Sequence, residues 1–247
     1  MPQSESTDAN AASQSAPNPS GGAPELELPL QAADERPAER PAERGPDALQ
    51  QARDFADAGE TAAAVTTLRA LIARDAKHAR ARAFLAELLE KRGDSEGALA
   101  ELGRALEVAP DDVVVLCQRA LLYTTKGRYD KAEVDLRNAV RVDDSSADVQ
   151  LQLGVLFCKR ARWREAIEPL RAAVAADPTR VAAHYYLGEA YNSIDELPNA
   201  LSAYQTAAAL DPKHHRALQS IGVVLDRLRR PTEAAVAYQR AREAQRK

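Results

Sequence analysis

Aromatic residues are scarce in this chain of 247 residues. Phenylalanine, tyrosine and tryptophan together make up only 4% of it, with three phenylalanines and a single tryptophan. Alanine, leucine, arginine and glutamate are abundant instead, and these residues have the highest helix propensities. A core with so few rings has to pack through small and aliphatic side chains, so the composition predicts helices.

Cysteine is equally rare. Cys117 and Cys158 are the only two in the chain. Two cysteines in a chain of this size do not form a disulfide framework, and their scarcity agrees with a reducing compartment.

Long apolar runs are missing as well. No stretch approaches the roughly 18–20 apolar residues that a membrane-spanning helix needs. The first five residues, MPQSE, lack the basic and apolar regions of a secretory signal. We therefore expect a cytoplasmic protein with no direct membrane insertion.

The chain has no excess of positive charge. Its formal net charge is −4, and residues 1–44 hold eight acidic residues against three arginines. The remainder is close to neutral and shows no basic stripe that would neutralise a phosphate backbone. Nucleic acid is thus excluded as an expected partner.

Signatures of catalysis are absent too. The sequence has no glycine-rich phosphate loop, no Gly-x-Ser-x-Gly elbow and no zinc-protease or kinase motif. The histidines do not show the spacing of metal ligands; they are His78, His184, His214 and His215. We expect no enzymatic activity, no catalytic residue, no cofactor and no metal site.

Residues 1–44 differ in composition from the rest of the chain. They are rich in Ser, Pro, Ala, Gly and acidic residues, and such a segment buries too little apolar surface to offset the entropy of ordering it. We expect a disordered tail. Its one apolar patch is Leu26, Leu28 and Leu30, which is either a few isolated leucines or a short docking motif that folds back onto the repeats.

The rest of the chain repeats itself every 34 residues without an insertion. This period is typical of one class of helical solenoid. The six predicted units are 45–78, 79–112, 113–146, 147–180, 181–214 and 215–247.

Particular positions of the unit support this alignment. Position 8 is always Ala or Gly, position 20 is always Ala, and position 24 is always Leu or Tyr. Small residues let two helices approach, and large ones fill the space between them. Position 15 is glycine in the first three units, where a turn between helices favours a positive φ; these glycines are Gly59, Gly93 and Gly127.

In period and in these positions, residues 45–247 resemble the tetratricopeptide repeat family. The resemblance implies an all-α fold, a right-handed superhelical α-solenoid of six helix–turn–helix units. The first helix of each unit (helix A) would line a concave groove and the second (helix B) would lie outside. Some family members bind the terminal carboxylate of a heat-shock chaperone through Lys and Asn at positions 5 and 9. Here those positions of the first four units hold Leu49 and Arg53, Ala83 and Glu87, Cys117 and Leu121, and Leu151 and Val155, so this clamp is absent.

The same resemblance places positions 2, 5, 9, 12 and 13 on the groove. In the third to fifth units these positions are mostly apolar, and charged residues occupy them toward both ends. The predicted partner-binding residues are Val114, Cys117, Leu121, Thr124, Leu151, Val155, Cys158, Tyr185 and Asn192, with a rim of Arg53, Arg80, Glu87, Lys91, Arg216 and Arg227. The two cysteines lie at different levels of their helices, about 10 Å apart along the helix axis, so we expect both thiols to be free.

The sequence therefore predicts a protein-interaction module or adaptor. An apolar strip with a charged rim suits an amphipathic helix or an extended apolar segment of a partner protein. Two alternatives stay open: a structural component that self-associates into homo-oligomers, and the regulatory subunit of an enzyme. The preference for Arg over Lys and the high alanine content hint at a bacterial genome rich in G and C.

Overall fold

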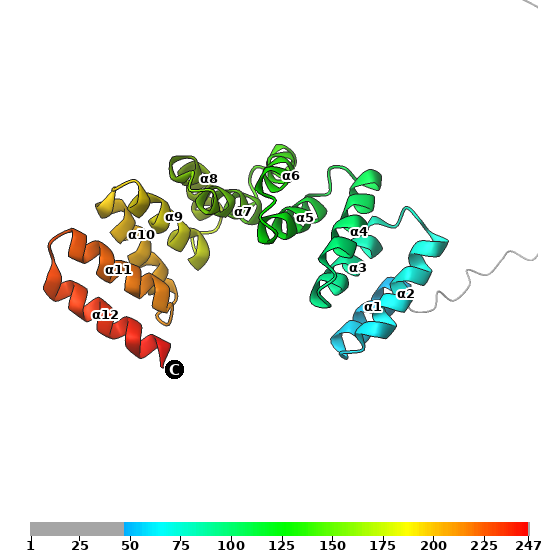
Figure 1. Cartoon of the computed structure of the whole chain (residues 1–247), viewed down its shortest axis with the longest axis horizontal. Helices are drawn as coiled ribbons and strands as arrows, with labels where there is room; N and C mark the ends of the chain where they lie inside the picture. Colours follow the sequence, from blue (N-terminus) through cyan, green and yellow to red (C-terminus); the bar gives the residue numbers. More distant parts are fainter. Residues whose placement is uncertain (1–46, 247) are drawn as a thin grey trace, which may run out of the picture. The chain divides into compact units, whose positions relative to one another are not determined.

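The computed structural model describes residues 47–246, and within them the chain forms twelve α-helices and no strand (Figure 1). The predicted tail 1–44 and its leucine patch lie outside the described residues. The helices are α1 (Ala48–Asp57), α2 (Thr61–Arg74), α3 (Ala79–Lys91), α4 (Ser95–Val108), α5 (Val113–Thr125), α6 (Tyr129–Val142), α7 (Ala147–Lys159), α8 (Trp163–Ala176), α9 (Val181–Ser193), α10 (Leu197–Leu210), α11 (His215–Arg227) and α12 (Pro231–Gln245). The predicted all-α class is confirmed.

Helices pack in chain order. Each odd-numbered helix packs most extensively against the even-numbered helix that follows it, and that helix then packs against the next odd-numbered one. Contacts therefore join neighbours along the chain, which is the defining property of a solenoid. From α3 onward the odd-numbered helices begin 34 residues apart, at Ala79, Val113, Ala147, Val181 and His215.

Side chains just before the helices fix where several of them begin. Asp112 accepts hydrogen bonds from the backbone N–H groups of Val114 and Val115 at 3.0 and 3.2 Å, which satisfies donors that the first turn of α5 leaves free. The imidazole Nδ1 of His78 accepts from Ala81 N–H at 3.2 Å at the start of α3. An aspartate or serine does the same for α1, α4 and α7.

The turn inside every helix pair holds one residue in the left-handed region. In the first three pairs this residue is glycine; in the last three it is Ala161, Asp195 and Arg229, with φ of 55°, 68° and 61°. The backbone geometry of position 15 is therefore kept throughout, while the glycine that favours it is not. Only the glycines signalled this turn in the sequence.

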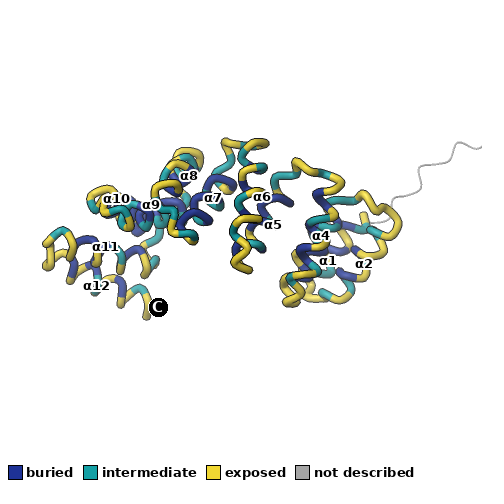
Figure 2. The backbone as a smooth tube through the Cα atoms, turned by 45° about the horizontal axis from the view of Figure 1, so that its top comes forward, coloured by how far each residue is buried: buried dark blue, intermediate teal, exposed yellow. Residues whose placement is uncertain are grey.

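The core lies between the helices of each pair and between successive pairs. Figure 2 shows buried positions where neighbouring helices face each other and exposed positions at the turns. Leu68, Leu136, Leu170 and Tyr204, all at position 24, are at most 1% exposed. Large side chains at this position fill the space that the small residues of helix A leave open.

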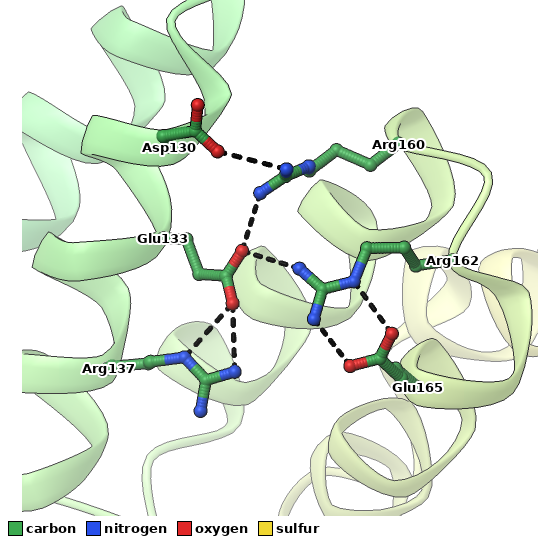
Figure 3. Close-up of polar contacts among 6 residues, drawn as sticks. All are labelled: Asp130, Glu133, Arg137, Arg160, Arg162 and Glu165. Carbon is green, nitrogen blue, oxygen red and sulfur yellow. Dashed lines mark hydrogen bonds and ion pairs between the residues drawn. The ribbon is translucent and has the colours of Figure 1, made fainter.

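An ion cluster joins α6 to the turn between α7 and α8 (Figure 3). The carboxylate of Glu133, 14% exposed, accepts hydrogen bonds from Arg137 of its own helix and from Arg160 and Arg162 of the following pair, at 2.6 to 3.0 Å. Asp130 pairs with Arg160 at 2.9 Å. The guanidinium of Arg162 also lies 4.5 Å from the ring centroid of Phe157, a cation–π distance. The cluster fixes the third pair against the fourth.

Candidate functional site

A hollow lies on helices α1, α3 and α5. It has a volume of about 570 Å³, within the range of peptide and small-ligand sites. A smaller hollow of about 210 Å³ adjoins it and shares Glu87 and Gln118. The larger one, hereafter the α1–α3–α5 pocket, is lined by Arg53, Ala56, Asp57, Arg80, Ala83, Phe84, Glu87, Lys91, Asp112, Val114, Val115 and Gln118.

Apolar side chains stand exposed in these two hollows. Val114 at the start of α5 is 65% exposed, and Leu121 two turns later is 52% exposed. Phe84 of α3, partly buried, also lines the pocket. Large aliphatic side chains this open to solvent, grouped beside a hollow, are typical of binding surfaces.

Two of the three acidic groups of the α1–α3–α5 pocket have partners, whereas Asp57 is exposed and forms no ion pair with any described residue. Glu87 pairs with Lys91 at 2.7 Å, and this hydrogen bond, with a smaller effect from Asp57, raises the pKa of the lysine. Asp112 caps α5. Arg53 and Arg80, in contrast, are exposed and form no ion pair with any described residue, so their positive charges are free in the pocket.

A glutamine adds an unusual feature. The side-chain oxygen Oε1 of Gln118 is buried and accepts no hydrogen bond from the described residues, although the residue lines both hollows. Gln152, at the equivalent position of α7, has the same unmet acceptor. Buried acceptors without a donor are rare because leaving them unpaired costs free energy. Gln118 and Phe84 share position 6, which the sequence reasoning did not assign to the groove, so both were missed.

Three predicted groove residues are buried instead of facing a partner. Cys117, Thr124 and Cys158 are only 7 to 8% exposed, and the Thr124 hydroxyl donates to the carbonyl of Ala120 at 2.8 Å. Both thiols are free, as expected. Burial raises the pKa of Cys117 to about 11 and that of Cys158 to about 12. These side chains therefore contribute to packing between helices and are not reactive groups of an open surface.

The remaining groove residues lie further along the chain. Leu151 and Val155 of α7 are partly buried. Tyr185 of α9 packs between aromatic rings, with centroids at 5.0 Å from His214 and 5.8 Å from Tyr204, and its burial raises its pKa to about 12. This part of the predicted strip is less open than the part that Val114 and Leu121 occupy.

The predicted rim residues divide into two groups. Arg53, Arg80, Glu87 and Lys91 line the α1–α3–α5 pocket itself. Near the other end, Arg227 donates to the carbonyl and side chain of Asn192 and to Asp195, while Arg216 is exposed. Asn192, which was predicted to face a partner, is therefore hydrogen-bonded to Arg227 of the same chain.

Over residues 47–246 no three His, Cys, Asp or Glu side chains are grouped closely enough to hold a metal ion. None of the described helices is long and apolar enough to cross a membrane.

Comparison with protein families agrees with the helix pairs. One tetratricopeptide repeat family model matches residues 55–116, and a second matches residues 117–180, 151–213 and 195–247. The chain belongs to the tetratricopeptide repeat family. No curated protein sequence matches it.

Solved structures share the fold. MamA from Desulfovibrio magneticus RS-1 is 25% identical with a TM-score of 0.64, over 68% of this chain and 95% of that one. YrrB, described as a tetratricopeptide protein with an unusual peptide-binding site, is 23% identical over 72% and 92% with a TM-score of 0.62. PilF from Pseudomonas aeruginosa has a TM-score of 0.69 at 19% identity, over 77% and 86%. The last two likenesses concern the fold alone.

Proposed function

We propose that this tetratricopeptide protein is a non-enzymatic interaction module and that a segment of a partner protein binds along the odd-numbered helices. The observation that carries the proposal is the exposure of Val114 and Leu121 beside the α1–α3–α5 pocket. An isolated exposed leucine needs no explanation, whereas apolar side chains gathered at a hollow with charged walls fit a bound peptide.

The bound segment is a helix or an extended strand of a protein. A hollow of about 570 Å³ takes only a few side chains, so the affinity has to come from a short linear segment rather than from a whole folded surface. The apolar side chains of α5 supply burial, and the charged rim supplies orientation. The same fold serves peptide binding in YrrB.

The test compares two charged substitutions. Leu121→Asp, on α5 beside the pocket, should abolish capture of the partner by the full chain. Val134→Asp is the matched control, because Val134 lies on α6 and is 59% exposed against 52% for Leu121. If both variants capture the same proteins as the original chain, the segment does not bind at this face.

The molar mass in solution distinguishes an adaptor from a chain that associates with itself. Light scattering over a concentration series would show a rising mass for a chain that assembles with itself, and a constant monomer mass for an adaptor. If the mass rises in the original chain and in Val134→Asp but not in Leu121→Asp, the segment that binds the face belongs to a second copy.

A further inference from the structure

We infer that the α1–α3–α5 pocket takes an extended, acidic segment of a partner protein, in which glutamates or aspartates alternate with leucine-like residues. The inference rests on the proposed function and names the chemistry of the segment. It is carried by three observations in this pocket and the hollow that adjoins it: two arginines against one carboxylate without an ion pair, exposed apolar side chains, and one buried acceptor that has no donor.

Charge complementarity gives the acidic character. Of the charged groups that line the pocket, Glu87 pairs with Lys91 and Asp112 caps α5. The other charges, which have no ion-pair partner among the described residues, are those of Arg53, Arg80 and Asp57, so the two arginines outnumber the one free carboxylate and leave a net charge of +1. Arg80 lies in the first turn of α3, where the helix dipole adds positive potential. Carboxylates match arginine because its planar fork donates two hydrogen bonds at once.

The apolar character comes from exposed side chains of α5. Val114 is 65% exposed at the pocket, and Leu121 is 52% exposed at the adjoining hollow. In an extended peptide successive side chains point to opposite sides. A sequence that alternates acidic and apolar residues can therefore present carboxylates to the arginines and leucines to α5.

Gln118 is an acceptor in the pocket for a donor of the ligand, although Gln152 has the same unpaired oxygen and lines neither hollow. Its buried Oε1 lacks a hydrogen bond, and a bound peptide carries one backbone N–H per residue that is free when the peptide is extended. A backbone N–H donated to Gln118 would satisfy the orphan oxygen. A free carboxylate or a lipid tail has no such donor, so a peptide fits the pocket better than either.

The probe is a terminally blocked, fluorescein-labelled peptide of sequence GELELELG, titrated into the full chain and followed by anisotropy. Blocking removes the terminal carboxylate, so only side-chain carboxylates are tested. We expect saturable binding that weakens as salt is raised. The peptides GQLQLQLG and GESESESG, which lack the charges and the leucines respectively, should each bind much more weakly.

Paired variants locate the site. Arg53→Gln with Arg80→Gln should weaken binding of the acidic peptide by roughly tenfold or more, as expected for loss of hydrogen bonds to charged groups. Arg164→Gln with Arg240→Gln removes the same charge from exposed arginines that form no ion pair with described residues, and should leave binding unchanged. Gln118→Leu should weaken binding of all three peptides without altering the salt dependence.

Several results would overturn the inference. If both arginine double variants weaken peptide binding equally, the effect comes from the net charge of the chain and not from the pocket. If GELELELG and GQLQLQLG bind equally well, the pocket does not recognise carboxylates. The chain has an acidic segment of its own at Glu25 and Glu27, which would compete with the added peptide if it occupied the pocket. If Glu25→Gln with Glu27→Gln makes the peptide bind more tightly, the pocket binds this segment and not a partner. If the peptide fails to bind while Leu121→Asp still abolishes partner capture, the acidic segment is wrong and the groove function stands.

Discussion

The ring of Tyr204 on α10 lies directly over Gly188 of α9. A Cβ built on that glycine would lie 2.6 Å from Cδ1 and Cε1 of the ring, closer than real carbon atoms approach. Tyr204 is fully buried, and its hydroxyl donates to Glu189 at 2.5 Å. The ring is thus held at both ends and has no room to move aside.

Gly188→Ala should therefore destabilise the protein. Overpacking a closed core site costs about 1–3 kcal/mol, whereas the better helix propensity of alanine returns only about 1 kcal/mol. Because the Cβ would lie within 3 Å of three ring atoms, the cost falls at the upper end of this range, and we expect a net loss of up to about 2 kcal/mol, measured as a lower urea midpoint by circular dichroism. Gly103→Ala is the control, since nothing lies within 4 Å of a Cβ at that helical glycine, and it should raise the midpoint.

Ala161→Gly should act in the opposite direction at the turn between α7 and α8. Ala161 has φ of 55°, a conformation that costs an L-residue about 1–2 kcal/mol. The greater conformational freedom of glycine in the unfolded chain reduces this gain in stability by about 0.4–1 kcal/mol. The net gain of about 0.5–1 kcal/mol should appear as a higher thermal midpoint. Ala100→Gly, at an exposed position inside α4, should lower the midpoint instead; a drop in both variants would contradict the argument.

The fold was predictable because the same packing pattern recurs in all six units of the sequence. A small residue at position 8 and a large one at position 24 recur in each unit, and the structure packs them against each other. Left-handed turns at Ala161, Asp195 and Arg229 could not be read from the sequence. Once the helices of a pair are packed, the short connection imposes that conformation on whichever residue occupies it.

The candidate site was less predictable. The 34-residue pattern assigns Leu121 and Cys117 to the same face, yet one is 52% and the other 8% exposed. Exposure depends on how closely adjacent odd-numbered helices approach, and that distance is set by tertiary packing. Gln118 was overlooked for the same reason, since a glutamine in an amphipathic helix gives no sign that its oxygen will be buried without a donor.

Arg119 and Asp135 form a buried pair whose strength can be measured by a double-mutant cycle. Two hydrogen bonds join the guanidinium to the carboxylate at 2.7 and 2.8 Å, and the aspartate side chain is 3% exposed. Arg119→Met leaves that carboxylate buried without its partner and should cost about 3 kcal/mol. Adding Asp135→Leu should recover much of the loss, because no charge is then left buried.

The surface pair Arg141 and Asp111 provides the control cycle. Its ions lie 2.7 Å apart but are 65% and 63% exposed, so solvent screens them and their coupling should stay below about 1 kcal/mol. If the two cycles give equal coupling energies, burial is not what strengthens the pair of Arg119 and Asp135.

The ion cluster around Glu133 should make stability depend on pH. Burial by itself would raise the pKa of Glu133, but hydrogen bonds from Arg137 and Arg162 outweigh it and hold the pKa below the usual 4.5. A carboxyl group whose pKa is lower in the fold than in the unfolded chain stabilises the fold fully above the unfolded value. That contribution is lost as the pH falls through the lower, folded value.

Glu133→Gln removes this contribution and so gives the test. The difference in urea midpoint between the original chain and Glu133→Gln should be large near pH 7 and should shrink as the pH falls below about 4. Glu168→Gln is the control, because Glu168 is 82% exposed and lies 3.4 Å from Arg171 alone. Its difference should be small at every pH. A difference for Glu133→Gln that stays constant from pH 7 to pH 3 would mean that the three arginines act through packing alone, since a protonated Glu133 would then stabilise the fold as well as the carboxylate does.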